Sequence, residues 1–387
     1  VSAQRRRGEM EKKMKEKGLF REEVKKFVKE QIEPYAENFE IEESIPKSII
    51  QLLGDRGYLS LSDSSNSNLK VDYDKVAILN EEVCRASSAI RSLFTVQGMS
   101  ILSIERWGTI EQKENYLNKL KAGEIIGAFG MSEENVGSDA STVYTTGVLQ
   151  SNSILINGRK KWITMGAIAD VFIMFVNIDE KVTAVLVEKN DVGVKVIPTH
   201  GMFGVKGSML AEIEMVNCIV PKSRILGEIG GGTPYISQTC LDYGRFTIAW
   251  GCIGSAKECL EIVCAYTDKR KQFGKKLCEH ELIQKKITQM YCELHACELL
   301  CQQCTEMKKE GTPDSILENW IAKYKSSKMI NFVANEAMQI LGAYGLNDDS
   351  TLPRHFRDSR ANEIIEGTSE IHEMMIAKEV VNLLKNR

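Results

Sequence analysis

The sequence predicts a multidomain α+β protein with a helical domain, a middle β domain and a C-terminal helical bundle. Helical periodicity dominates both ends of the chain, and short β-branched runs fill the region between them. A length of 387 residues exceeds one ordinary core, so two or three domains are expected. We place these domains at 19–124, 125–232 and 233–387, and we interpret residues 1–18 as a disordered segment or an extension.

Composition and charge exclude several classes of protein. Apolar residues make up 43% and charged residues 27%, which is typical of a soluble globular chain. A net charge of −3 argues against a nucleic-acid binder, and no apolar run approaches the ~20 residues of a membrane span. The 11 scattered cysteines indicate reduced thiols in the cytoplasm. Arg5-Arg6-Arg7 lacks the apolar run of a secretory signal, and Met10 is a candidate natural start.

The first helical domain is predicted from apolar stripes and one capping signal. A stripe before Pro34 comprises Leu19, Phe20, Val24, Phe27, Val28 and Ile32. Thr109 followed by Gln112 forms a capping box, which predicts a helix that begins at that point. Residues 62–70 are rich in Ser and Asn and indicate a surface loop.

The middle domain is predicted from short β-branched segments. Strands are expected at Val171–Val176, Thr183–Val187 and Val194–Ile197. Asn157-Gly158 is a two-residue hairpin signal. The helices that a parallel Rossmann sheet requires between its strands are missing from this pattern.

Long helices are expected to return from about Thr233. Apolar residues and cysteines form one face over 283–304, and Pro313–Leu341 is a second long helix. Helices of this length commonly form a four-helix bundle and carry an oligomer interface.

The stretch Glu363–His372 holds the strongest candidate for chemistry. Glu366 directly precedes a glycine and a helix whose first residues, Thr368 and Ser369, carry hydroxyls. A carboxylate on a loop before a helix N-terminus can be aimed as a base. The alternative interpretation is a plain helix cap with a surface acid.

Two segments at the start of the β domain have polar and aromatic groups suited to a heterocyclic ligand. Phe129–Asp139 contains hydroxyls and small residues, although it also resembles an ordinary loop. Trp162 could be a strand core residue, or it could stack on a planar cofactor while Thr164 donates a hydrogen bond.

Two further segments follow long predicted helices. Arg270, in Arg270–Gly274, could be a partner of the helix dipole or could bind a phosphate. Gly342 and Gly345 are natural helix C-caps, and glycine also permits close approach of a ligand.

Several other motifs carry no chemistry in this interpretation. Four cysteines at helical spacing are expected to be small core residues and not metal ligands. They are Cys292, Cys297, Cys301 and Cys304. Gly230-Gly231-Gly232 lacks a phosphate-binding context, and neither an H-E-x-x-H nor a G-x-S-x-G motif is present. No metal site is predicted.

Together and in this order, these segments resemble the acyl-CoA dehydrogenase family from about Leu19 to the C-terminus. The matching pieces are Met131-Ser132-Glu133, Gly137-Ser138-Asp139, Lys161-Trp162-Ile163-Thr164, Asp242-Tyr243-Gly244-Arg245, Arg270-Lys271-Gln272-Phe273-Gly274, Gln339-Ile340-Leu341-Gly342 and Ile365-Glu366-Gly367-Thr368-Ser369. The resemblance implies a β-barrel-like middle domain and a C-terminal four-helix bundle. It also implies FAD at a subunit interface and a homotetramer.

The resemblance assigns roles position by position. Glu366 looks like the base that removes the α-proton of an acyl thioester. Expected FAD contacts are Met131, Ser132, Ser138, Trp162, Thr164, Arg270, Phe273, Gln339, Gly342, Thr368 and Glu370. Gln339 and Gly342 are expected to reach the FAD of a neighbouring subunit. Asp242 and Arg245 match positions that contact the pantetheine or nucleotide arm of the substrate carrier.

Departures from the family pattern concern the substrate. Some relatives place the base at the position of Gly244, which cannot serve here and strengthens the assignment to Glu366. Met165 and Ala343 replace a frequent Asn and Gly, and Ser62–Asn68 replaces a Tyr-Gly-Gly loop. The segment Leu241–Cys252 is similar to members that act on acyl-carrier-protein thioesters in polyketide and peptide antibiotic pathways.

The sequence therefore leads to an FAD-dependent dehydrogenase of a short acyl thioester, expected to be tethered to an acyl carrier protein, as in hydroxymalonyl or aminomalonyl extender-unit formation. A catabolic acyl-CoA dehydrogenase that forms a trans-2-enoyl-CoA is the enzyme alternative. A non-catalytic flavin-binding scaffold is the third hypothesis. The electron acceptor, an electron-transfer flavoprotein or oxygen, stays open.

Overall fold

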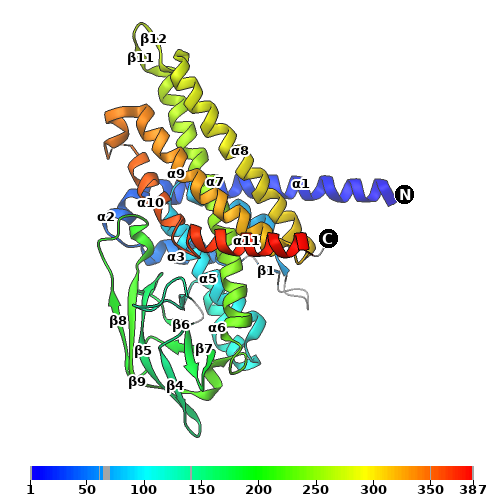
Figure 1. Ribbon diagram of the computed structural model, residues 1–387, viewed down its shortest axis with the longest axis vertical. Helices are drawn as coiled ribbons and strands as arrows, with labels where there is room; N and C mark the ends of the chain where they lie inside the picture. The colour runs from blue at the N-terminus through cyan, green and yellow to red at the C-terminus, as the bar shows by residue number, and fades with distance from the viewer. Residues whose placement is uncertain (1, 61, 64–69, 140–141, 349, 386–387) are drawn as a thin grey trace.

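The computed structural model describes residues 2–60, 62–63, 70–139, 142–348 and 350–385. Figure 1 shows long C-terminal helices above a β domain, with the N-terminal helices beside the junction. The helices that precede the sheet are α1 (Ser2–Phe27), α2 (Ala36–Ile41), α3 (Lys47–Asp55), α4 (Tyr73–Cys84), α5 (Ser88–Trp107) and α6 (Ile110–Ala122). A π-helical turn at Val28–Ile32 and a 3₁₀ turn at Glu33–Tyr35 connect α1 to α2.

The N-terminal helices confirm most of the apolar pattern. Val24, Phe27 and Ile32 are buried, whereas Leu19 is exposed. The capping box is present: the Thr109 Oγ1 accepts from the Gln112 N–H, and the Gln112 Oε1 accepts from the Thr109 N–H. Helix α1 begins well before Leu19 and projects from the body of the molecule (Figure 1). Of the expected polar loop, 64–69 lies outside the described residues.

The middle domain is an open sheet. Its path is β10-β7-β6-β4-β5-β9-β8, and β3 pairs with β6 in parallel. Among the described residues no pairing joins β8 to β10, so the barrel-like closure expected from the resemblance is not found. The strands are β3 (Gly127–Gly130), β4 (Thr146–Leu149), β5 (Ser153–Ile163), β6 (Val171–Ile178), β7 (Lys181–Glu188), β8 (Val194–Pro198), β9 (Ala211–Pro221) and β10 (Ile225–Leu226).

The expected hairpin at Asn157-Gly158 is wrong. Both residues lie inside β5, where its pairing with β9 shifts register between Ile156 and Gly158. The Asn-Gly pair therefore lies at a β-bulge, which, like a tight hairpin turn, uses unusual backbone angles. The turn between β4 and β5 lies at Gln150–Ser153, where the Gln150 N–H donates to the Ser153 carbonyl.

The C-terminal part is a set of packed helices. They are α7 (Gln238–Lys269), α8 (Glu281–Glu310), α9 (Ser315–Leu341), α10 (Leu352–Asn362) and α11 (Ser369–Lys385). Helix α9 packs against α7, α8, α10 and α11, and α7 also packs against α4 and α5. Helix α7 thus joins the bundle to the N-terminal domain.

The helical cysteines and two short ribbons complete the fold. Cys297, Cys301 and Cys304 are buried as expected, but Cys292 is exposed because it lies off the core face of α8. The ribbons pair β1 (Ser62–Asp63) with β2 (Lys70–Val71) and β11 (Lys271–Gln272) with β12 (Lys275–Lys276). Within the described ranges, no helix is long and apolar enough to cross a membrane.

Candidate active site

Glu366 lies in the turn between α10 and α11 with its backbone held by two buried cations. Its φ of +55° is in the left-handed region, which is unfavourable for a side chain with a Cβ, and Gly367 follows at φ +96°. The Arg245 Nε donates to the Glu366 carbonyl at 3.1 Å, and the Lys323 Nζ donates to the Gly367 carbonyl at 2.7 Å. These two contacts offset the cost of the unusual backbone and fix the direction of the Glu366 side chain.

The Glu366 carboxylate lies directly over Gly244 of α7. A Cβ at position 244 would be 2.6 Å from Glu366 Oε2 and 2.4 Å from Met99 Cε, so only glycine leaves room for this carboxylate. Although the residue as a whole is half-buried, its Oε2 is shielded from solvent and has no hydrogen-bond partner among the described residues. A carboxylate oxygen with this exposure and no donor is available to accept a proton.

Burial raises the pKa of Glu366 to about 7, against the opposing charges of Arg245, Lys323 and Arg91. The pKa values of two neighbouring basic groups are lowered by burial. Burial lowers the pKa of Lys323 to about 8, and burial also lowers the pKa of His372 to about 4. His372 is therefore neutral near pH 7, and its Nδ1–H donates to the Thr368 carbonyl at 3.0 Å.

The helix that follows Glu366 has the expected cap. The Thr368 Oγ1 accepts from the Ile371 N–H at 3.4 Å, while the Ser369 Oγ is buried with no partner among the described residues. Thr368 is half-buried and Glu370 is exposed. The cap interpretation is correct for Thr368, but Glu366 is not a surface acid, so capping does not account for it.

Helices α5 and α7 form an antiparallel pair beneath the carboxylate. Their contacts run from Ser103 Oγ and Cys240 Sγ at 2.9 Å, through Met99 and Gly244, to Thr95 Oγ1 and Thr247 Oγ1 at 2.8 Å. One turn further on, a Cβ at Gly251 would lie 3.3 Å from the Arg91 Cγ. Glu366 therefore faces a row of side chains contributed by two long helices.

Trp162 is exposed at a bulge in β5. The pairing of β5 with β9 shifts between Lys160 and Ile163, and Trp162 has a φ of +62°. The indole is 49% exposed, with the Lys161 ammonium 5.2 Å from its ring centroid. The core interpretation of Trp162 is thus wrong. Thr164, two residues on, is half-buried.

The polar loop after β3 is fixed to the same strand. The buried Lys160 ammonium donates to Glu133 at 2.7 Å, and Glu133 also accepts from the Tyr144 and Thr145 N–H groups. The Lys161 N–H donates to the Ser132 carbonyl at 2.9 Å. Met131 and Ser132 are half-buried beside Trp162 along this strand, and Ser138 is exposed.

The remaining predicted cofactor contacts lie away from Glu366. Arg270 ends α7 and is exposed, and Phe273 is 97% exposed in the β11–β12 ribbon, at the end of α7 and α8 remote from the sheet (Figure 1). Gly342 ends α9 at φ +61° with no atom within 4 Å of its missing Cβ, and Gln339 is exposed. The surface around these four residues is open to solvent, and their contact with the cofactor stays a prediction.

Asp242 and Arg245 differ in accessibility. The Asp242 carboxylate accepts from the Lys308 Nζ at 2.6 Å and from the Asn319 Nδ2 at 2.8 Å, so it joins α7 to α8 and α9. Arg245 is buried and contacts the Glu366 backbone. Contact of either residue with the substrate arm stays a prediction.

Sequence reasoning missed Lys323, Arg91, Thr95 and Thr247. All four are buried polar residues on helices. Arg91 and Thr95 stand four residues apart on one face of α5. Two polar residues on the buried face of a largely apolar helix are a signal that could have identified them. Lys323 has no comparable local signal, because its partner Gly367 is distant in sequence.

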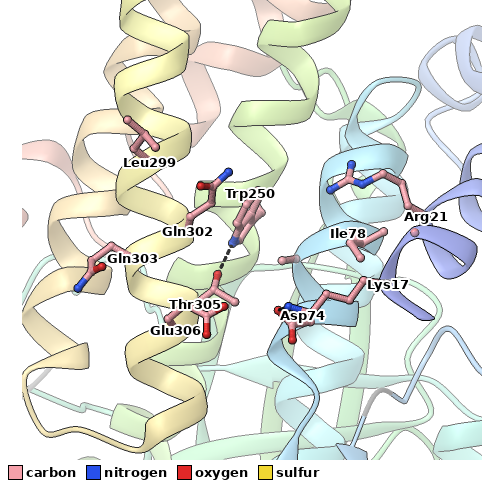
Figure 2. A pocket seen from close by; sticks show the side chains of 12 residues that line it. Lys17, Arg21, Asp74, Ile78, Trp250, Leu299, Gln302, Gln303, Thr305 and Glu306 are labelled. Carbon is pink, nitrogen blue, oxygen red and sulfur yellow. Dashed lines mark hydrogen bonds and ion pairs between the residues drawn. The ribbon is translucent and has the colours of Figure 1, made fainter. Parts of the chain in front are cut away.

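A cavity of about 570 Å³ lies elsewhere, between α1, α4, α7 and α8 (Figure 2). Trp250 and Thr305 are hydrogen-bonded at its wall at 3.1 Å, and Lys17 pairs with Asp74 at 2.7 Å. The cavity contains neither Glu366 nor any predicted cofactor contact. Because its charged groups already form ion pairs with one another or with neighbouring side chains, we assign it no part in the chemistry.

Comparison with known proteins covers nearly the whole chain. Three family models match: the acyl-CoA dehydrogenase N-terminal domain at residues 14–124, the middle domain at 128–218 and the C-terminal domain at 230–381. A mitochondrial 2-methylacyl-CoA dehydrogenase of Solanum tuberosum is 33% identical over 93% of this chain and 89% of its own length.

Solved structures agree with this match. A glutaryl-CoA dehydrogenase from Mycobacterium smegmatis in complex with FADH2 is 27% identical, with a TM-score of 0.89 over 95% of each chain. The prolyl acyl carrier protein oxidase AnaB is 26% identical, with a TM-score of 0.88 over 94% of this chain and 98% of that one. The fold, the shielded carboxylate oxygen of Glu366 and these similarities lead to one conclusion: the chain belongs to the acyl-CoA dehydrogenase family.

Proposed function

We propose that this protein is an FAD-dependent dehydrogenase of a short acyl thioester and that Glu366 is the base that removes the α-proton. The observation that carries the proposal is the Glu366 carboxylate over Gly244, with a buried Oε2 that has no donor and a pKa raised to about 7. A base with a pKa near the working pH combines a populated deprotonated form with enough proton affinity.

The residues around β5 fit a planar, polar cofactor. The Trp162 indole is half exposed at a bulge that presents it outward. Thr164 provides a hydroxyl directly after β5, and Ser132 provides one from the loop after β3, whose backbone is hydrogen-bonded to β5. FADH2 is bound in a solved relative, and FAD supplies the hydride acceptor when it is present. Arg270, Phe273, Gln339 and Gly342 are proposed to contact its distal parts, with Thr368 and Glu370 closer to the base.

The protein's part in the reaction is positioning and proton transfer. The thioester carbonyl makes the α-hydrogen acidic, and Glu366 Oε2 receives that proton. Arg245 holds the carbonyl of Glu366 and Lys323 holds the carbonyl of the next residue, so the carboxylate keeps its direction during the transfer. Burial of the site limits water, which strengthens each electrostatic contact.

We propose an acyl carrier protein as the carrier of the thioester. Similarity to AnaB and the segment Leu241–Cys252 support this proposal. The oxidised group would then be a short oxygen- or nitrogen-bearing chain of the hydroxymalonyl or aminomalonyl type, made for polyketide or peptide biosynthesis. The alternative is a catabolic acyl-CoA dehydrogenase, which similarity to the 2-methylacyl-CoA enzyme supports.

The carrier is tested by offering the same acyl group on two carriers. Purified protein loaded with FAD is mixed anaerobically with an acyl thioester of CoA or of a phosphopantetheinylated carrier protein, and bleaching of the flavin is followed. We expect faster reduction by the carrier-protein thioester at equal concentration. Faster reduction by the CoA thioester would favour the catabolic alternative, and no reduction by any thioester would favour the non-catalytic scaffold.

The electron acceptor and compartment are proposed on chemical grounds. An electron-transferring flavoprotein and oxygen are the two candidate acceptors, and one similar solved structure comes from a study of an electron transferring flavoprotein of Acidaminococcus fermentans. All 11 cysteines are free thiols, which supports the reducing environment of the cytoplasm.

The rate of flavin reduction is expected to rise with pH through about 7. Glu366 must be deprotonated to accept the α-proton, and its pKa is raised, so the active fraction grows as pH increases and levels off above the pKa. An ordinary Glu would give this inflection near pH ~4.3. The measurement is the apparent kcat/KM for flavin reduction across this pH range, because this quantity reports the pKa of the protein without substrate. A flat profile between about pH 6 and pH 8 would contradict the role of this carboxyl.

A homotetramer is expected in solution. Long helices leave large apolar side chains exposed on α8 and α11, including Leu282, Tyr291, Leu299, Met374 and Leu384. Apolar surface of this kind commonly marks a subunit interface. Size-exclusion chromatography with light scattering measures the mass, and a monomer with full flavin content would contradict the proposal.

A further inference from the structure

The β8–β9 loop, residues 199–210, is hydrogen-bonded to the C-terminal bundle. The Asp358 Oδ1 of α10 accepts from the Val205 N–H at 2.6 Å, and both residues are buried. A Cβ at Gly204 would lie 2.4 Å from the Arg357 carbonyl oxygen, so glycine lets the loop approach α10 closely. The end of the sheet that carries this loop lies next to α2 and α10 (Figure 1).

The same loop is hydrogen-bonded to the N-terminal domain. The Glu40 Oε2 of α2 accepts from the Lys206 N–H at 2.9 Å, and its Oε1 accepts from the Gly207 N–H at 3.4 Å. A Cβ at Gly207 would lie 2.9 Å from the Ala89 Cβ of α5. The β8–β9 loop therefore joins the β domain to both helical domains.

The two carboxyls and the loop backbone are costly to the fold, so stability alone does not account for them. Burial raises the pKa of Asp358, and burial and the Asp358 charge raise the pKa of Glu40 to about 7, against the charge of Arg354. A Glu in the unfolded chain has a pKa of about 4.3, so the protein loses stability at Glu40 as the pH rises from there through about 7. Val205 has a φ of +52°, which is unfavourable for a β-branched residue, and such strain collects at functional sites.

The other end of the loop holds the turn that follows β5. The Met165 N–H donates to the Ser208 carbonyl at 2.8 Å, and the Ala167 N–H donates to the Met209 carbonyl at 3.1 Å. Met165 directly follows Thr164, which is proposed to contact FAD. A displacement of the loop would therefore move this proposed flavin contact.

Asp358 and the base belong to one continuous segment of the chain. Helix α10 extends past Asp358, and Glu366 lies in the turn that follows the helix. The Ile365 N–H donates to the Ala361 carbonyl at 3.0 Å, so the start of this turn is bonded to the last turn of α10. A hydrogen bond at Asp358 thus fixes the helix that leads into the base.

We propose that the β8–β9 loop sets the distance between Glu366 and the flavin ring, and that Asp358 and Glu40 are its positioning residues. The proposal rests on the proposed function, because it needs the base at Glu366 and the flavin beside Thr164. The α-carbon of the acyl group must meet the base while its β-carbon meets the flavin, so both distances must be correct together. The loop links the segment that carries the base to the turn that carries the flavin contact.

Two reactions of the FAD-loaded protein separate this role from a general structural one. Anaerobic flavin reduction is measured with butyryl pantetheine and 3-hydroxypropionyl pantetheine, and the faster of the two for the wild type is used throughout. Exchange of the α-hydrogens of acetyl pantetheine in D2O needs the base but no hydride transfer, because an acetyl group has no β-carbon. Glu366 and the predicted contacts of the substrate arm, Asp242 and Arg245, all lie in the C-terminal part, so a shift of the β domain leaves them together.

Asp358→Ala removes the acceptor of the Val205 N–H. We expect flavin reduction to slow by about 10- to 100-fold, up to the size expected for a misplacement of about 1 Å, while exchange stays within about three-fold of the wild type. Asp358→Asn keeps an oxygen for the same N–H and should retain most of the reduction rate.

The other outcomes overturn the proposal or the function beneath it. An equal loss in both reactions of Asp358→Ala would show a merely structural role and overturn the proposal. An unchanged reduction rate in folded Asp358→Ala would overturn it as well. Failure of the wild type to reduce its flavin with either thioester would contradict the proposed function itself.

Glu40→Gln serves if Asp358→Ala fails to fold. Glutamine keeps the size of the side chain but replaces one of the two oxygens that accept from the Lys206 and Gly207 N–H groups. Flavin reduction should slow several-fold with exchange unchanged. Equal rates of flavin reduction in folded Glu40→Gln and the wild type would contradict the assignment in that case.

Asp191→Ala is the matched control. Its Oδ2 accepts from the Glu188 N–H at 2.7 Å, so this variant also removes a carboxylate that holds a backbone N–H of the β domain, but in the turn after β7. Both reactions should proceed at the wild-type rates. A selective loss of flavin reduction as large as that of Asp358→Ala would show that the effect does not depend on the β8–β9 loop, and would overturn the proposal.

Discussion

Glu366→Gln is expected to slow flavin reduction by at least about 10²–10⁴-fold, the usual loss when a positioned general base is removed. Glutamine keeps the size of the side chain but cannot take up the α-proton. The backbone contacts from Arg245 and Lys323 involve carbonyl oxygens, so the substitution leaves them in place. We therefore expect the fold and the FAD content to stay close to those of the wild type.

The measurement is anaerobic stopped-flow reduction of the bound flavin by a working thioester. Glu373→Gln is the matched control, because Glu373 is an exposed acid on α11 that bonds Tyr324 and Lys328. The control should reduce its flavin at the wild-type rate. If Glu366→Gln stayed within a few-fold of the wild type, Glu366 would be no more than the residue that precedes a helix cap.

Gly244→Ala should also reduce the rate strongly, by about 100-fold, because an error of about 1 Å in the placement of a reacting group has effects of this size. The added methyl would lie 2.6 Å from Glu366 Oε2 and 2.4 Å from Met99 Cε. Met99 can move because its side chain is flexible, but Glu366 is held by its backbone. The carboxylate must therefore turn away from its position over α7.

Gly18→Ala is the control for Gly244→Ala. Both glycines lie inside helices, but nothing lies within 4 Å of a Cβ at position 18. Alanine favours a helix over glycine by about 1 kcal/mol, so neither change should unfold its helix. Rates of flavin reduction and thermal unfolding are compared in both variants. A Gly244→Ala protein with the wild-type rate would show that the space over Gly244 is not needed by the base.

The sequence predicted the elements whose signals are local. Three such features depend on neighbours within a few residues. They are the Thr109–Gln112 capping box, the burial of Val24 and Ile32, and the end of α7 at Arg270. The Asn157-Gly158 hairpin was wrong for a related reason. The same dipeptide suits a bulge, and only the partner strand β9 decides between the two.

The candidate site was predicted in part. The position of Glu366 before a glycine and a helix suggested a base, but neither its burial nor its contact with Gly244 is visible in a local pattern. Lys323 and Arg91 were missed because their partners come from other helices. Trp162 changed from a core candidate to an exposed residue because a register shift in β5 turns its side chain outward.

Exchange of the α-hydrogen tests the role of Glu366 most directly, because it separates proton removal from oxidation. An acetyl thioester has α-hydrogens but no β-carbon, so it cannot deliver a hydride to the flavin. The FAD-loaded protein is incubated with this thioester in D2O, and incorporation of deuterium is followed by mass spectrometry. We predict exchange well above the protein-free rate for the wild type and exchange at the protein-free rate for Glu366→Gln. Equal exchange by both proteins, or none by either, would contradict the assignment of Glu366 as the α-proton base.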